Sequence, residues 1–241
     1  MRALFFEFPD EPELFTADRQ WLVGASILVT PVLTPGDTTV DGESGDRNFL
    51  WLANPVLTLR HLAIFPGRCN VIWRDWWTHA VIPLSNNSGA TTKVTIAAPL
   101  GHINVHIRGG SILLLHAKPA YTIYETRSGP YELLVSLDGE GSACGDAFVD
   151  DGDGAFDGTD LGKNLVFKAG GGKLSVRSGT GSYHIGQSLE RVTVLGVGEK
   201  PQKVVVQGQG VTGWQYDGTI GELDIGCFSV DLNGDVDVSW E

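Results

Sequence analysis

The stretch that decides the fold is His102-Ile103-Asn104-Val105-His106-Ile107-Arg108. Its three aliphatic residues alternate with polar residues, so in an extended backbone they share one face, as expected for a half-buried strand. Gly109-Gly110 interrupts the alternation, and Ser111–His116 is a second strand candidate directly after it. Two strand candidates separated by a glycine turn indicate a β-rich fold.

Further strand candidates lie on both sides of this pair and are separated by Gly, Asp, Asn and Pro turns. They are residues 26–33, 69–73, 91–97, 131–137, 146–150, 164–168, 173–177, 182–185, 190–196, 203–207, 212–216, 222–225 and 236–240. A spacing of about 8–12 residues in the second half is typical of an antiparallel sandwich. The sole helix candidate is a single turn or two within Glu11–Trp21.

We therefore predict an all-β chain with two domains. A proximal antiparallel β-sheet domain covers about residues 1–117, and a distal β-sandwich domain covers about residues 118–241. The boundary is expected near Ala117-Lys118-Pro119, where a strand candidate ends.

The composition indicates a globular protein and restricts its partners. Apolar residues make up 42% of the 241 residues, close to the globular average. The formal net charge of −12 repels phosphate backbones and anionic lipids, which argues against nucleic-acid and membrane partners. No apolar run approaches the ~20 residues that span a bilayer, and the N-terminal segment does not read as a signal peptide. This charge suits neutral ligands such as sugars.

The three cysteines, Cys69, Cys144 and Cys227, lie far apart and lack the spacing of metal ligands. Because an odd number does not suit a disulfide framework, we expect three reduced and at least partly buried thiols. Asn86-Asn87-Ser88 is an N-glycosylation sequon, usable only if the chain is secreted.

Several segments together resemble the glycoside hydrolase family 31 α-glucosidases, in particular the fungal ones. They are Arg2–Asp10 with Leu22–Leu33, Ile64–Arg68 with Trp73–Thr78, Ala98–Gly110, and Asp150-Asp151-Gly152. Their order is that of the family, and the segment APLGHINVHIRGG is nearly identical to it. Collinearity over most of the chain is more specific than any single segment.

The resemblance implies that this segment follows a catalytic (β/α)₈ barrel and continues into two β domains. The family's nucleophile and acid/base aspartates lie upstream, in motifs resembling W-x-D-M-N-E and G-D-N, and neither motif occurs here. Retaining hydrolysis needs two carboxylates about 5–5.5 Å apart, held at a barrel rim. We therefore assign no catalytic residue and predict that the chain alone is inactive. By the same resemblance the protein would be secreted or extracellular.

One departure from the family is an insertion at about residues 43–63. In relatives the segments that correspond to Val40–Gly42 and Ile64–Pro66 almost abut. Here the residues between them include two apolar runs, Asn48–Leu52 and Leu57–Leu59. The segment is either a genuine insertion that folds over the proximal sheet or translated non-coding sequence.

The first candidate carbohydrate site is an aromatic cluster formed by Trp73, Asp75, Trp76 and Trp77. Aromatic faces stack on the C–H surfaces of sugars, and the carboxylate would accept hydrogen bonds from hydroxyl groups. The favoured alternative is core packing, with Trp73 and Trp77 on one face of a strand and Trp76 on the other.

The second candidate carbohydrate site is the pair Trp214 and Tyr216, which alternate along a distal strand. Their period places both rings on one face of the sheet, where they could stack on a sugar. Ordinary packing in the sandwich core is the favoured alternative.

A dense acidic turn contains Asp150, Asp151, Asp153 and Asp157. Carboxylates among flexible glycines suit Ca²⁺, the one cofactor considered for this chain. The spacing does not match an EF-hand, and a solvated hairpin loop is the favoured alternative.

The expected partners follow from the resemblance. Leu4, Phe5, Phe6 and Phe8 would pack against the barrel, and without it they would need cover from a second copy or a barrel chain. The leading function is a non-catalytic carbohydrate-associated module, a lectin for glycans or glycoproteins. The alternatives are a structural C-terminal part of an α-glucosidase that needs its barrel, and a lone hydrolase with an unrecognised site.

Overall fold

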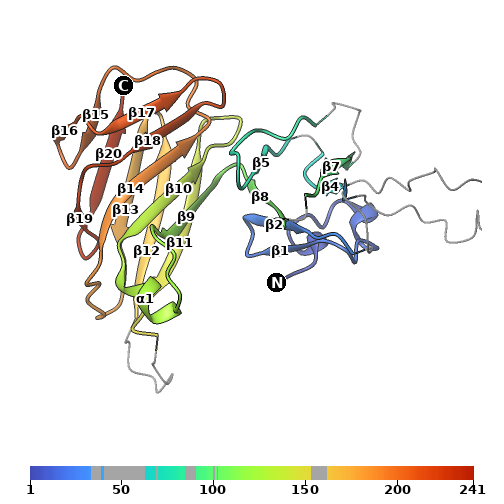
Figure 1. Cartoon of the computed structure of the whole chain (residues 1–241), viewed down its shortest axis with the longest axis horizontal. Helices are drawn as coiled ribbons and strands as arrows, with labels where there is room; N and C mark the ends of the chain where they lie inside the picture. Colours follow the sequence, from blue (N-terminus) through green and yellow to red (C-terminus); the bar gives the residue numbers. More distant parts are fainter. Residues whose placement is uncertain are drawn as a thin grey trace, which may run out of the picture. The chain divides into compact units, whose positions relative to one another are not determined.

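The computed structural model is built almost entirely of β-strands, which confirms the predicted fold class (Figure 1). It describes residues 1–33, 39–40, 63–68, 70–84, 91–99, 101, 103–152 and 162–241. Within these ranges no helix is long and apolar enough to cross a membrane. Most of the expected insertion at about 43–63 lies outside the described residues, as do Cys69 and the sequon at 86–88.

The chain divides into two compact units, Met1–Arg108 and Gly109–Glu241. The division precedes the boundary expected near Ala117-Lys118-Pro119. Strand β9 (Ser111–His116) is the reason, because it pairs along its whole length with β10 (Tyr131–Ser136) of the second unit.

A four-stranded antiparallel sheet forms the centre of the proximal unit. Its order is β1 (Trp21–Val23), β2 (Ile27–Thr30), β8 (Asn104–Arg108) and β5 (Trp73–Asp75). Two smaller pairs join β3 (Thr39–Val40) to β7 (Ile96–Ala97) and β4 (Ala63–Phe65) to β6 (Thr92–Val94). The core of this unit includes Leu22, Leu28, Phe65 and Trp73.

Strand β8 confirms the predicted strand but corrects its predicted faces. Ile107 is fully buried, whereas Ile103 precedes the strand and is 59% exposed. The polar residues Asn104 and His106 are buried as well. The physical reason is the central position of β8, which lies between β2 and β5, with Phe65 packed against His106 on the face expected to be polar.

The helix candidate at Glu11–Trp21 is confirmed only as a single turn. Only the 3-10 turn Pro12–Leu14 forms there, and Trp21 begins strand β1. A second 3-10 turn, Leu4–Phe6, precedes it, and the two turns bury Leu4 and Leu14.

A 12-stranded sheet forms the distal unit. Besides β9 and β10, its strands are β11 (Ala143–Val149), β12 (Lys163–Gly170), β13 (Lys173–Ser178), β14 (Ser188–Leu195), β15 (Val204–Val206), β16 (Gln209–Val211), β17 (Trp214–Asp217), β18 (Glu222–Ile225), β19 (Val230–Asp231) and β20 (Val236–Trp240). The order is β16-β15-β20-β13-β12-β11-β9-β10-β14-β18-β17, with β19 beside β14.

This sheet folds over one hydrophobic core, which agrees with the predicted sandwich (Figure 1). Phe167 and Val176 of β12 and β13 share that core with Leu133, Val194 and Ile225 of β10, β14 and β18. The pairing is mostly antiparallel, but β10 runs parallel to β14 along its whole length, and β9 contacts β11 in parallel at one residue pair. The distal unit therefore departs from a purely antiparallel sandwich chiefly in the long parallel pairing of β10 with β14.

Residues 182–185 form no strand, although the sequence predicts one there. The backbone N–H of Ile185 donates to Asn233 Oδ1 at 2.9 Å, and the Asn233 amide donates to Ile185 O at 2.8 Å. A side-chain amide thus takes the hydrogen bonds that a neighbouring strand would have made.

One short helix, α1 (Ile123–Ser128), connects β9 to β10. A capping box at its N-terminus is formed by Thr122 and Glu125, which bond each other's backbone N–H groups at 3.2 Å. No residue of α1 is buried, so the sequence carries no helical apolar period that could have predicted it.

Cys144 and Cys227 are free thiols, as expected, but both are exposed. The expectation of partial burial is therefore wrong for these two. Cys144 points outward from β11, where alternate residues face the core, and Cys227 lies in a turn with a φ of 57°.

Candidate functional site

The predicted aromatic cluster separates into a buried and an exposed part. Trp73 is fully buried, and its indole N–H donates to Pro66 O at 2.9 Å. Trp76 is half-buried, and its backbone N–H donates to Val105 O at 2.9 Å. Trp77 is 55% exposed. The cluster is therefore not one continuous aromatic face.

Strand β5 ends at Asp75, which corrects the expectation that Trp73 and Trp77 share a strand face. Asp75 Oδ1 accepts hydrogen bonds from the backbone N–H groups of Trp77 at 2.9 Å and Thr78 at 2.7 Å, and from the Thr78 hydroxyl at 2.9 Å. These bonds close a turn directly after the strand. Because the chain turns after Asp75, Trp77 is no longer part of the extended strand, and the alternation of side chains that would have placed it beside Trp73 does not apply.

Two polar groups at the exposed end of this cluster are already used within the chain. Trp77 donates its indole N–H to Ile103 O at 3.0 Å, and Asp75 Oδ1 holds the turn. The exposed part of the Trp77 ring is the aromatic surface that this place presents to solvent.

Trp214 and Tyr216 lie on one side of β17, as the period of two predicts. Both rings are half-buried and pack against the distal core, and the Tyr216 hydroxyl donates to Val197 O at 2.9 Å. Core packing, the favoured alternative, therefore accounts for Tyr216. Trp214 differs, because it also lines a surface groove.

That groove has a volume of about 430 Å³ and is called here the Trp214 groove. Its walls include Glu190, Arg191, Trp214, Gln215, Asp224 and Cys227. Arg191 and Asp224, which lie on the neighbouring strands β14 and β18, form a two-point ion pair with Nε–Oδ1 and Nη2–Oδ2 distances of 2.7 Å. The hydrogen bond with Asp224 raises the pKa of Arg191. Sequence reasoning missed the groove because β14, β17 and β18 meet there from distant parts of the chain.

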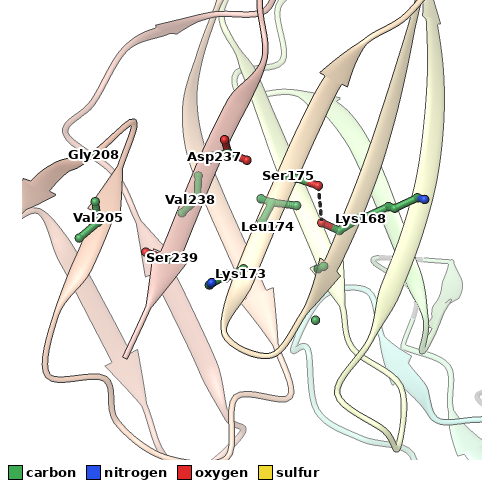
Figure 2. A pocket seen from close by; sticks show the side chains of 11 residues that line it. Lys168, Lys173, Leu174, Ser175, Val205, Gly208, Asp237, Val238 and Ser239 are labelled. Atoms are coloured by element: carbon green, nitrogen blue, oxygen red, sulfur yellow. Dashed lines mark hydrogen bonds between the residues drawn. The ribbon is translucent and has the colours of Figure 1, made fainter.

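A second groove of about 660 Å³ crosses the outer side of β12, β13, β20 and β15 (Figure 2). Its lining includes Lys168, Lys173, Ser175, Val205, Asp237 and Ser239. The Ser175 hydroxyl donates to Lys168 O at 3.4 Å, and Asp237 Oδ1 accepts from Arg177 Nη2 at 2.7 Å. None of the described residues that line this groove is aromatic, so they offer no stacking surface to a sugar.

The described part of the acidic turn is held to helix α1. Asp150 Oδ1 accepts hydrogen bonds from Arg127 Nη2 at 2.8 Å and from Gly152 N at 3.0 Å. Arg127 also donates to Asp150 O at 2.9 Å. Asp151 is exposed, and Asp153 and Asp157 lie outside the described residues. Among the described residues no group of three His, Cys, Asp or Glu side chains is arranged to hold a metal ion.

The proximal unit exposes an aromatic surface cluster of Phe5, Phe6 and Phe15. Phe5 stacks on Phe6 with ring centroids 4.8 Å apart, and the Phe15 ring meets Phe5 edge-on at 5.6 Å. Phe6 is 67% and Phe15 59% exposed. Phe8, by contrast, is buried, with the Arg108 guanidinium 4.7 Å above its ring. Of the residues expected to face a barrel, Leu4 and Phe8 are thus part of the unit's own core.

Two of the buried ionisable groups in the same unit, His106 and Arg74, have a lowered pKa. Burial lowers the pKa of His106 to about 4, against a smaller opposing effect of Asp75. Burial also lowers the pKa of Arg74 to about 10. Both side chains are enclosed by the proximal sheet and open into neither of the two grooves described above.

The comparison with known families assigns residues 1–113 to the glycosyl hydrolase family 31 C-terminal domain. An α-glucosidase of Schizosaccharomyces pombe is 39% identical over 241 residues, which is all of this chain and 22% of that protein. An α-glucosidase of Aspergillus niger is 37% identical over 213 residues, 88% of this chain and 19% of that protein. The chain thus spans about a fifth of the length of these curated relatives.

Solved structures show the same fold. The glucosidase II α subunit matches with a TM-score of 0.76 and 19% identity over 99% of this chain and 25% of its own. A Flavobacterium johnsoniae GH31 dextranase in complex with glucose matches with a TM-score of 0.70 and 17% identity, over the whole of this chain and 29% of its own. At these identities the likeness concerns the fold alone.

Proposed function

Since the chain corresponds over its whole length to the C-terminal β domains of fungal-type family 31 α-glucosidases, we propose that it is a structural part of such an enzyme and works only beside a catalytic barrel. The motifs that carry the family's two catalytic aspartates do not occur in the sequence. In this proposal the barrel performs the glycoside hydrolysis, and this chain completes and stabilises its surface.

The observation that carries the proposal is the exposed cluster of Phe5, Phe6 and Phe15. Aromatic rings dominate the energetics of protein interfaces, and a contiguous apolar patch on a soluble protein marks a site of contact. The three rings hold each other in place, so the surface is already ordered before a partner binds. A barrel chain would bury Phe6 and Phe15 at little cost in conformational entropy.

The geometry of the Trp73–Trp77 segment does not favour a lectin at that place. Trp73 is buried, Trp77 has donated its indole N–H internally, and Asp75 Oδ1 already accepts three hydrogen bonds. A sugar site needs polar groups that remain available to hydroxyl groups. Glycan binding at this segment is therefore not our proposal.

The proposal is tested by reconstitution. A family 31 α-glucosidase cut before the segment that matches this chain supplies the barrel, and the two polypeptides are co-expressed. We expect hydrolysis of a chromogenic α-glucoside from the co-purified pair and none from this chain alone. The variant Phe6→Ser/Phe15→Ser should abolish co-purification, whereas Val166→Ser, an exposed apolar residue of the distal unit, should not.

Two outcomes would overturn the proposal. One is hydrolysis by the purified chain alone that a single Asp substitution abolishes, which would establish a lone hydrolase. The other is a folded barrel polypeptide that neither binds this chain nor gains activity from it.

A further inference from the structure

The turn between β19 and β20 contains Asn233-Gly234, the only Asn-Gly pair in the sequence. We propose that this pair is a site of deamidation that the fold keeps closed, and that it reacts only when the segment at residues 182–185 opens. The product at position 233 is then unable to rebuild the contact that held this segment. The inference does not depend on the structural role proposed above, because all its residues lie within the distal unit.

Four hydrogen bonds fix the side chain of Asn233. Its amide donates to Ile185 O at 2.8 Å and to Asp231 Oδ1 at 2.6 Å, and its Oδ1 accepts from Ile185 N at 2.9 Å and from Lys163 Nζ at 3.3 Å. Ile185 is 2% exposed and belongs to the distal core. The Asn233 side chain therefore ties the turn to a buried residue of another segment, and both its donors and its acceptor oxygen are used.

An Asn-Gly pair is chemically labile, because glycine has no side chain to shield its backbone nitrogen. The nitrogen of Gly234 attacks Cγ of Asn233, and the Cγ–Nδ2 bond breaks. The departing amide takes up the proton that Gly234 N gives up, and leaves as ammonia. Water then opens the resulting succinimide at either carbonyl, which leaves aspartate or isoaspartate at position 233. The net change is the gain of water and the loss of ammonia, so water is the sole reactant required.

The fold blocks this reaction at Asn233 rather than at Gly234. Gly234 is exposed, and no atom lies within 4 Å of the position that a Cβ would take there. Attack on Cγ requires the carboxamide to rotate toward the backbone of Gly234, and this rotation breaks its bonds to Ile185 and Asp231. The rate of deamidation is therefore set by how often the segment at 182–185 opens, which is a local equilibrium rather than global unfolding.

The product does not fit the closed arrangement. A carboxylate oxygen in the place of Nδ2 would face Ile185 O at 2.8 Å and Asp231 Oδ1 at 2.6 Å without a hydrogen to donate to either. Hydrogen bonds from the backbone and side chain of Asn233 lower the pKa of Asp231, so this neighbour is ionised and repels a new negative charge. Lys163 is a single cation against these two carboxylates. Deamidation thus makes a transient opening of the segment permanent.

The test compares deamidation in the intact chain with that in a synthetic peptide of residues 229–237, which has the same Asn-Gly pair but no contact with Ile185. Both are incubated in mildly alkaline buffer. Conversion at position 233 is followed by peptide mass spectrometry and by enzymatic methylation of isoaspartate. We expect the chain to react roughly a hundredfold more slowly than the peptide, since opening must break several hydrogen bonds at once. Equal rates would overturn the proposal.

Variants separate the reactive pair from the contacts that restrain it. Asp231→Ala removes the acceptor of two Asn233 N–H groups and should raise the rate in the chain about tenfold. Asp217→Ala should leave the rate unchanged. It is the matched control, because Asp217 accepts a hydrogen bond from the backbone of Thr219 in the same way but in another turn. An unaltered rate in Asp231→Ala would contradict the restraint proposed here.

Gly234→Ala should suppress deamidation and preserve the fold, because the φ of Gly234 lies outside the left-handed region and the space beside it is open. The consequence for the segment is measured by hydrogen exchange, since Asn233 Oδ1 protects the N–H of Ile185. We expect residues 182–187 to exchange faster in the aged chain and in Asn233→Asp, but not in aged Gly234→Ala. Unchanged protection in Asn233→Asp would overturn the proposal. None of these measurements involves a barrel chain, so they are independent of the reconstitution experiment.

Discussion

His106 lies edge-on against the ring of Phe65, with the ring centroids 4.9 Å apart and the ring planes at 86°. The imidazole is 1% exposed, and its Nδ1 has no hydrogen-bond partner among the residues that the structure describes. A protonated ring at this position would be a buried charge that the nearby Asp75 compensates only in part. This is why burial lowers the pKa of His106 to about 4, despite the opposing effect of Asp75.

The proximal unit should therefore lose stability in mild acid. Above the ordinary pKa of 6.5 the imidazole is neutral in both the folded and the unfolded chain. Between pH 6.5 and about 4 only the unfolded chain takes up the proton, so stability falls as pH falls, by up to about 3 kcal/mol. Urea unfolding at pH 7 and pH 4.5 measures this loss.

The matched variants are His106→Leu and His184→Gln. His106→Leu should reduce the acid-dependent loss, whereas His184→Gln, at an exposed position, should leave it unchanged. An unaltered pH dependence in His106→Leu would show that another group is responsible.

The tryptophans of the aromatic segment should differ strongly in their effect on stability. Trp73→Ala removes a fully buried ring and leaves Pro66 O without its donor, at a cost of about 3–5 kcal/mol. Trp77→Ala removes an exposed ring and one hydrogen bond, at a cost below about 1.5 kcal/mol. Urea unfolding of the two variants compares them. Equal costs would contradict the division into a buried and an exposed ring.

The acidic turn should not depend on calcium. Asp150 Oδ1 is already occupied by Arg127 and by Gly152 N, so a Ca²⁺ ion would have to compete with an ion pair. We expect millimolar CaCl₂ and EDTA to leave the melting temperature of the distal unit unchanged. A saturable rise with Ca²⁺ that is absent in Asp151→Asn would instead establish a calcium site.

The isolated chain should self-associate through Phe6 and Phe15. These rings are exposed in the proximal unit, and a second copy would remove apolar surface from water. Light scattering after size-exclusion chromatography, over a range of concentrations, should show a dimer that Phe6→Ser/Phe15→Ser dissociates. The same substitutions should barely affect unfolding, because neither ring belongs to the buried core. A monomer at all concentrations would contradict this expectation.

The local periodicity of the sequence was sufficient to predict the positions of most of the strands. Candidates at 111–116, 222–225 and 236–240 match β9, β18 and β20 residue for residue. Each of these runs follows a glycine turn, and the alternation along β18 and β20 reflects a core on one side only. Helix α1 had no such signal, since it buries nothing and depends on the capping box at Thr122.

The sequence by itself determined the fold class and the family resemblance, because alternation, turn residues and collinear motifs are local properties. Which residues are buried was decided by the tertiary structure. The sequence pattern places His106 on the polar face of a strand. In the structure it is enclosed, because β8 is a central strand and Phe65 packs against this face. Trp77 reads as the partner of Trp73, yet the turn held by Asp75 separates them. The Trp214 groove exists only where β14, β17 and β18 meet, and hydrogen bonds between residues far apart in the chain are invisible to any local pattern.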